Sequence, residues 1–181
     1  MTLLALGLIL WIAAHLFKRL APGARAALDP AGRAVVAIAI LAALVLMVIG
    51  YRQAEGTVFW GRSPMLTGLN NLLMLVSVYL FAAAGMKTAL GRHLRHPMLM
   101  SVMVWSAAHL LVNGDTPSFL LFGGLGLWAL VQIRVINASG PRPTPMPGKG
   151  AQMEIIAVAG TLAVYGAIAG AHYALGYPVF G

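Results

Sequence analysis

The segment VVAIAILAALVLMVIGYR, residues 35–52, contains no charged residue before Arg52. A helix that crosses the hydrocarbon core of a bilayer needs about 20 mostly apolar residues. Five further segments meet this requirement, at Thr2–Leu20, Leu69–Leu90, Pro97–Asn113, Pro117–Ile136 and Met153–Leu175. The pattern predicts an all-α, polytopic membrane helix bundle of about six transmembrane helices. We expect the chain to form a single integral membrane domain over residues 1–181.

Composition supports a membrane protein and excludes several other classes. Of the 181 residues, 60% are hydrophobic and 9% are charged, whereas a soluble domain has about 25% charged residues. This excludes a soluble globular domain, a disordered chain and a coiled coil. The formal net charge is +8, but the basic residues are scattered between apolar segments, so we expect a lipid bilayer and no nucleic acid as partner. The chain has no cysteine, which excludes disulfides and thiolate metal ligands.

The basic residues also predict how the chain is oriented. The connections after the first, third and fifth spans hold ten Lys and Arg residues, whereas the other side of the membrane holds only Arg52 and Arg62. Because Lys and Arg accumulate on the cytoplasmic side, both termini are predicted to be periplasmic. An even number of spans follows, in agreement with six. The ten residues are Lys18, Arg19, Arg25, Arg33, Lys87, Arg92, Arg95, Arg134, Arg142 and Lys149.

Two histidines within apolar spans stand in nearly the same local sequence. Trp11 precedes His15, and Trp105 precedes His109, in the shared pattern Trp-x-Ala-Ala-His-Leu, with Ser106 at the variable position of the second copy. Residues spaced i, i+4 share one helix face, and ionisable residues at membrane depth indicate a functional site. The correspondence of the first and fourth spans also suggests a 3+3 inverted repeat. Simple interhelical packing is the alternative explanation. We expect His93 to lie at the membrane interface. We expect His172 to form a hydrogen bond with another helix.

The histidine pair restricts which metal group the protein can hold. Two histidines cannot build a four-ligand structural zinc site, but they can supply both axial ligands of a haem. His15 and His109 are therefore the predicted metal ligands, with Trp11, Trp105 and Ser106 beside them. Two ligands of one iron must lie at the same depth in the membrane. This is a difficulty for the pair, because His15 lies near the basic end of its span and His109 near the opposite end of its own.

A second candidate site precedes the fourth span. Arg95 and His96 lie just before Pro97, where a helix N-terminus favours anions. A phosphate, a haem propionate or a lipid headgroup suits this position. The alternative is an ordinary basic loop that only orients the chain.

Three motifs together resemble the NnrU family of bacterial inner-membrane proteins. They are RHPML at residues 95–99, WSAAHLLVNGD at residues 105–115 and LFGG at residues 121–124. The resemblance extends over essentially the whole chain. It implies a role in denitrification or nitric oxide metabolism, with denitrification membrane proteins as partners. The family includes the plant 15-cis-zeta-carotene isomerase, so the resemblance also implies haem b.

The isomerase can be compared with this chain position by position. Its His-Pro element matches His96 and Pro97, its haem-associated histidine matches His109, and its N-terminal membrane histidine matches His15. The isomerase has a cysteine where this chain has Ser106, so ligand exchange through a thiolate is not implied here.

A second resemblance leaves the reaction class open. Arg-His-Pro before an apolar helix is similar to membrane methyltransferases that modify isoprenylcysteine or phospholipids with S-adenosylmethionine. Those proteins carry acidic residues further on, whereas Glu154 is the only acid here after Asp115. Three readings remain: a haem redox or isomerase-type enzyme, a methyltransferase, and a non-catalytic membrane assembly factor.

Overall fold

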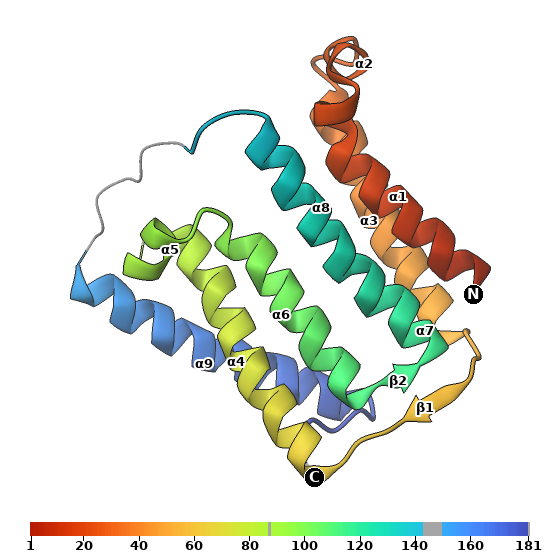
Figure 1. The fold of residues 1–181 in the computed structure, drawn as a ribbon, viewed down its shortest axis with the longest axis vertical. Coiled ribbons are helices and arrows are strands. Elements are labelled where there is room, and N and C mark those ends of the chain that lie inside the picture. The colour runs from red at the N-terminus through yellow and green to blue at the C-terminus, as the bar shows by residue number, and fades with distance from the viewer. Residues whose placement is uncertain (87, 143–149, 181) are drawn as a thin grey trace.

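The computed structural model describes residues 1–86, 88–142 and 150–180. It shows a bundle of helices with one short pair of strands (Figure 1). The elements are α1 (Thr2–Leu20), α2 (Pro22–Ala26), α3 (Gly32–Arg52), β1 (Val58–Trp60), α4 (Pro64–Met86), α5 (Ala89–His93), α6 (Pro97–Val112), β2 (Gly114–Asp115), α7 (Thr116–Ser118), the π-helical segment η1 (Phe119–Gly123), α8 (Gly124–Ala138) and α9 (Ala151–Ala174).

The all-α membrane bundle predicted from the sequence is confirmed. Five helices in the described part of the chain are long and apolar enough to cross a membrane. The fourth predicted span, α6, has 16 residues and is about 24 Å long at 1.5 Å per residue, which is shorter than a typical hydrocarbon core. The count of six spans, the single domain and the inverted repeat therefore stay predictions.

Local sequence explains where several helices begin. Pro97 occupies the first turn of α6, where a missing N–H costs nothing. The Asp115 carboxylate accepts a hydrogen bond from the Ser118 backbone N–H at 2.9 Å and caps α7. The π-helical turn of η1 and the pairing of β1 with β2 were not predicted.

Helices α1 and α3 form a hairpin whose axes come close together. A Cβ atom added at Gly50 would lie 2.3 Å from the Leu4 backbone nitrogen, and one at Gly7 would lie 2.8 Å from that of Met47. Small residues permit this separation, as in many membrane helix pairs. The hairpin then packs on α8 through a shared apolar core of Leu4, Leu8, Met47, Leu125, Trp128 and Ala129.

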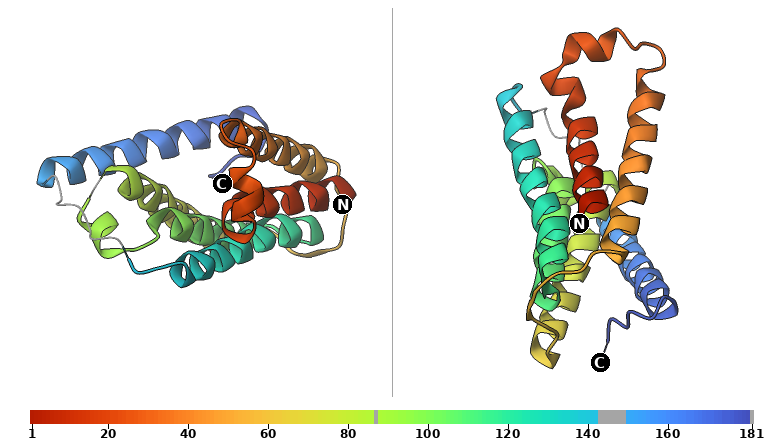
Figure 2. Two further views of the ribbon diagram at one scale, coloured as in Figure 1. Left: turned by 90° about the horizontal axis from the view of Figure 1, so that it is seen from above. Right: turned by 90° about the vertical axis from the view of Figure 1, so that its right-hand side faces the viewer.

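Helices α4, α6 and α9 form the second part of the bundle. The Ser77 hydroxyl donates to the Ser101 carbonyl at 2.9 Å, and the Ser101 hydroxyl donates to the Ser77 carbonyl at 2.7 Å. This reciprocal pair joins α4 to α6. In Figure 2 (left), α9 and α8 lie on opposite sides of α4 and α6. Helices α6 and α9 both pack on α4 and make few contacts with each other.

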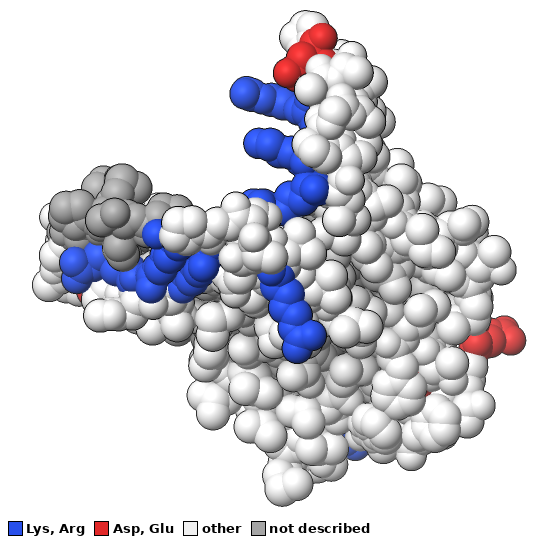
Figure 3. All heavy atoms as spheres, turned by 45° about the horizontal axis from the view of Figure 1, so that its top comes forward, with Lys and Arg blue, Asp and Glu red and all other residues white. Residues whose placement is uncertain are grey.

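The outer surface of the bundle suits a lipid environment. Large apolar side chains on the long helices are more than half exposed, for example Ile9 at 62%, Ile38 at 66% and Leu72 at 59%. Figure 3 shows Lys and Arg gathered on one flank, while most of the visible surface carries no charge. The chain is therefore a multi-pass membrane protein whose spans face the acyl chains of the bilayer.

Candidate cofactor site

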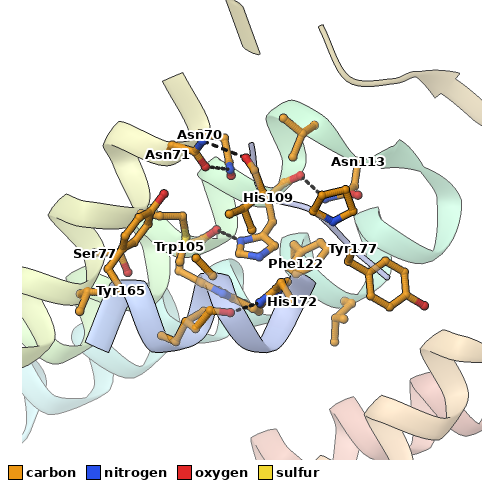
Figure 4. Close-up of a pocket in the computed structure, with 18 of the residues that line it drawn as sticks. Asn70, Asn71, Ser77, Trp105, His109, Asn113, Phe122, Tyr165, His172 and Tyr177 are labelled. Carbon is orange, nitrogen blue, oxygen red and sulfur yellow. Dashed lines mark hydrogen bonds between the residues drawn. The ribbon is translucent and has the colours of Figure 1, made fainter. Parts of the chain in front are cut away.

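A cavity with a volume of about 870 Å³ lies among α4, α6 and α9, beside η1. Its body is apolar and its mouth is polar (Figure 4). The mouth lies at the end of the bundle opposite the basic loops and is lined by Arg52, Arg62, Asn70, Asn71 and Asn113. An apolar pocket of this size with a few polar groups is the usual form of a small-molecule site.

His109 reaches this cavity from α6. Its Nδ1 lies 2.9 Å from the Trp105 carbonyl oxygen. A carbonyl can only accept, so Nδ1 carries the proton and Nε2 of the neutral ring keeps a free lone pair. The ring also packs against Trp105, with 4.8 Å between ring centroids, and against Phe122 at 4.7 Å. Metal-ligating histidines usually donate their second ring N–H in this way.

His172 lines the same cavity from α9, a role that sequence reasoning missed. Its Nδ1 lies 2.8 Å from the Ile168 carbonyl oxygen, so its hydrogen bond is within its own helix rather than to another one. The same tautomer follows, with Nε2 left as an acceptor. The sequence signal that could have identified His172 is its distance from the end of its helix. His172 lies two residues before the end of α9, and His109 lies three residues before the end of α6.

His15 does not line this cavity. Its ring packs between Trp11 and Trp128, with centroid distances of 4.3 Å and 4.7 Å, at the interface of α1 with α8. Trp128 and Phe122, the partners of His15 and His109, lie six residues apart on one continuous helix. That spacing corresponds to about 9 Å along the axis and about 120° around it. The structure therefore places the two predicted ligands at different helix interfaces.

The other predicted neighbours separate in the same way. Trp105 lines the cavity beside His109, whereas Trp11 stays with His15. Ser106 is buried where α6 faces α8. A Cβ atom added at Gly126 of α8 would lie 3.2 Å from the Ser106 hydroxyl oxygen.

Arg95 and His96 lie at the basic end of the bundle, away from the cavity. Arg95 donates to the Gly140 carbonyl at 2.7 Å, and His96 Nε2 lies 2.8 Å from the Asn137 amide oxygen. Both contacts anchor the loop to the end of α8.

Glu154 accepts hydrogen bonds from Tyr79 and from the Ala89 backbone. The residues that suggested a methyltransferase are thus engaged in structural contacts.

Comparison with known proteins gives one result for the whole chain. The family model for the NnrU protein matches residues 3–179. The chain belongs to the NnrU family. Comparisons with curated proteins and with solved structures give no match. Of the three NnrU-like motifs in the sequence, the one at residues 105–115 supplies Trp105, His109 and Asn113 to the cavity, and the one at residues 121–124 supplies Phe122.

Proposed function

We propose that this NnrU-family protein binds haem b in the bacterial inner membrane and acts in denitrification or nitric oxide metabolism. The observation that carries the proposal is the position of His109. Its imidazole lines an apolar cavity inside the bundle and keeps Nε2 free for a metal. The link to nitric oxide rests on the family.

The residues around the cavity fit a haem. The volume of about 870 Å³ lies within the range of ligand sites. Trp105 and Phe122 provide aromatic walls, and Arg52 and Arg62 line the mouth, where guanidinium groups can pair with propionate carboxylates. A bound haem would need only imidazole from the protein, and His109 would supply it.

The chemistry of such a site suits the proposed role. A bound haem supplies an iron that takes diatomic ligands such as nitric oxide and exchanges single electrons. The protein's own contribution is to fix the tautomer of His109, to exclude water with apolar side chains and to hold the site within the bilayer. None of these roles requires a thiolate, in keeping with Ser106 at the position where the isomerase has cysteine.

The first test is haem content. The protein is expressed with excess haem precursor, purified in detergent and examined by visible absorption and by haem assay per chain. We expect a Soret band in the wild-type protein, its loss in His109→Ala, and its retention in the matched variant His15→Ala. A wild-type protein without haem, or loss in His15→Ala with retention in His109→Ala, would contradict the proposal.

The second test addresses the role in the cell. In a denitrifying host, disruption of the gene should slow growth on nitrite and leave aerobic growth unchanged. The wild-type gene should restore growth, whereas His109→Ala should not, although the variant inserts into the membrane at the same level. Full restoration of growth by His109→Ala would show that the physiological role does not depend on the histidine in the cavity.

A further inference from the structure

The cavity among α4, α6 and α9 is elongated along the helices. On α4 its lining extends from Asn70 to Phe81, and on α6 it extends from Ser101 to Val112. Both ranges correspond to about 16 Å along a helix axis. The proposed haem site uses the wall formed by α6 and η1 together with the mouth. The wall formed by α4 and α9 has no part in it.

One side of the cavity is not closed by helix packing. Tyr51 and Arg52 line it from α3, and Val164 and Ile168 line it from α9. In the part of the chain that the structure describes, α3 packs chiefly on α1 and α9 chiefly on α4, and α3 and α9 make few contacts with each other. The side chains of Val164 and Ile168 are 50% and 36% exposed. The cavity therefore opens sideways toward the acyl chains, and a lipid-soluble molecule can enter it without crossing water.

Two buried polar atoms on the α4 and α9 wall lack a hydrogen-bond partner among the described residues. They are Asn70 Oδ1 and the Tyr165 hydroxyl. Asn70 Nδ2 donates to Asn71 Oδ1 at 3.1 Å, and Asn71 Nδ2 donates to the Val179 carbonyl at 2.9 Å. These bonds fix both amides and leave Asn70 Oδ1 as an unused acceptor. Because a buried polar atom without a partner costs stability, the two atoms favour a ligand that supplies one.

The C-terminal segment brings these two atoms to the same part of the cavity. The Val179 carbonyl binds Asn71, and the ring of the next residue, Phe180, packs on the Tyr165 ring with 6.4 Å between centroids. Figure 4 shows Asn70, Asn71 and Tyr165 on one side of the cavity. A head group that lies between α4 and α9 can therefore contact both atoms.

The two atoms restrict the chemistry of the ligand. An amide oxygen only accepts, so Asn70 Oδ1 requires a ligand that donates a hydrogen bond, whereas the Tyr165 hydroxyl can donate or accept. Met74, Val78 and Val102 line the deeper part of the cavity and suit a hydrocarbon tail. A flat ring that carries hydroxyl groups and a long apolar tail meets these requirements. Isoprenoid hydroquinones are membrane molecules of this form.

We propose that the α4 and α9 wall of the cavity binds an isoprenoid hydroquinone, which enters from the bilayer between α3 and α9. One ring hydroxyl donates to Asn70 Oδ1, and the Tyr165 hydroxyl bonds a ring oxygen. The tail follows the apolar lining. The oxidised quinone has no O–H group, so it leaves Asn70 Oδ1 unpaired and binds more weakly.

The test measures the binding of decyl-ubiquinone and of its hydroquinone to the purified protein in detergent, without oxygen, by calorimetry. We expect the hydroquinone to bind roughly 3- to 10-fold more tightly, as one hydrogen bond provides. Asn70→Leu should remove this preference, and Tyr165→Phe should weaken the binding of both forms. Tyr173→Phe is the matched control, because Tyr173 also lies on α9 but is 71% exposed and does not line the cavity. The wild-type comparison decides the question alone if Asn70→Leu does not fold.

A second measurement tests entry from the bilayer. Val164→Trp should slow hydroquinone association, because the larger side chain narrows the side opening. Leu162→Trp should leave the rate unchanged, since Leu162 is 58% exposed on the same helix but lies outside the cavity lining. Equal association rates in the two variants would overturn the side entry.

The outcomes separate this site from the proposed haem site. Equal affinity of the wild-type protein for the two forms would overturn the hydroquinone site, and so would displacement of the hydroquinone by an equal concentration of phosphatidylglycerol. The haem content of the same samples is measured in parallel. Preference for the hydroquinone in a protein without haem would overturn the haem proposal alone, whereas equal affinities in a haem-loaded protein would overturn the hydroquinone site alone.

Discussion

The imidazole of His109 stacks on the ring of Phe122, with 4.7 Å between ring centroids and 28° between ring planes. Phe122 belongs to η1, and its side chain is 6% exposed. The Trp105 ring packs on Phe122 as well, at 5.0 Å. The unpredicted π-helical turn therefore carries the side chain that supports the proposed ligand.

Replacement of Phe122 should loosen this support. An aromatic pair contributes about 0.5–1.5 kcal/mol beyond its buried area. Phe122→Leu is therefore expected to weaken haem retention by roughly 2- to 10-fold, measured as the rate of haem transfer to an apo-globin acceptor. Phe59→Leu is the matched control, because Phe59 is 60% exposed and lies in β1. Equal transfer rates in the two variants would argue against a supporting role.

The contact between α1 and α3 predicts a contrast between two glycines. At Gly50 an added Cβ atom would lie 2.3 Å from the Leu4 nitrogen, whereas at Gly166 it would meet nothing within 4 Å. Gly50→Ala should lower the free energy of unfolding by about 1–3 kcal/mol, the usual cost of overpacking. Gly166→Ala should leave it unchanged. Thermal unfolding in detergent measures both, and a stable Gly50→Ala variant would refute the close approach.

The reciprocal serine pair predicts a coupling between α4 and α6. Hydrogen bonds between membrane helices average about 0.6 kcal/mol and reach about 1.7 kcal/mol. Ser77→Ala should destabilise the protein by an amount in this range, and Ser101→Ala in its presence should cost less than it does alone. Ser139→Ala is the control, since that exposed hydroxyl bonds only within its own helix. Strict additivity of the two interior variants in a double-mutant cycle would show that the pair contributes no coupling.

Sequence patterns predicted the helices because apolar length alone specifies a membrane span. The segment Thr2–Leu20 matches α1 from end to end. The third span begins at Pro64 rather than at the predicted Leu69, because a proline is tolerated in the first turn of a helix. In the structure, Asn71 lies inside α4 and donates from its side chain to the Val179 carbonyl. A tertiary partner far away in the chain thus permits a polar residue that local composition argues against.

The candidate site was less predictable than the fold. His109 and Trp105 were identified from their rarity and spacing, and the structure places both on the cavity. The pairing with His15 followed the repeated motif, but a shared motif does not determine which helix faces which. His172 carries no motif, and only the packing of α9 on α4 brings it to His109. Local periodicity describes a helix face, whereas a cavity depends on how three helices meet.

The last prediction concerns orientation in the membrane. Residues Arg25, Arg92 and Arg142 lie at the end of the bundle that holds α2, α5 and the end of α8, while Arg52 and Arg62 lie at the cavity mouth. If basic residues stay in the cytoplasm, the cavity opens toward the periplasm. Reporter fusions at residues 27 and 145 should then report the cytoplasm, and a fusion after residue 181 should report the periplasm. Replacing Arg92, Arg95 and Arg142 by Gln should weaken this preference, whereas the same change at Arg52 and Arg62 should not. A cytoplasmic reporter after residue 181 would contradict both the orientation and the even number of spans, and it would place the cavity mouth on the cytoplasmic side.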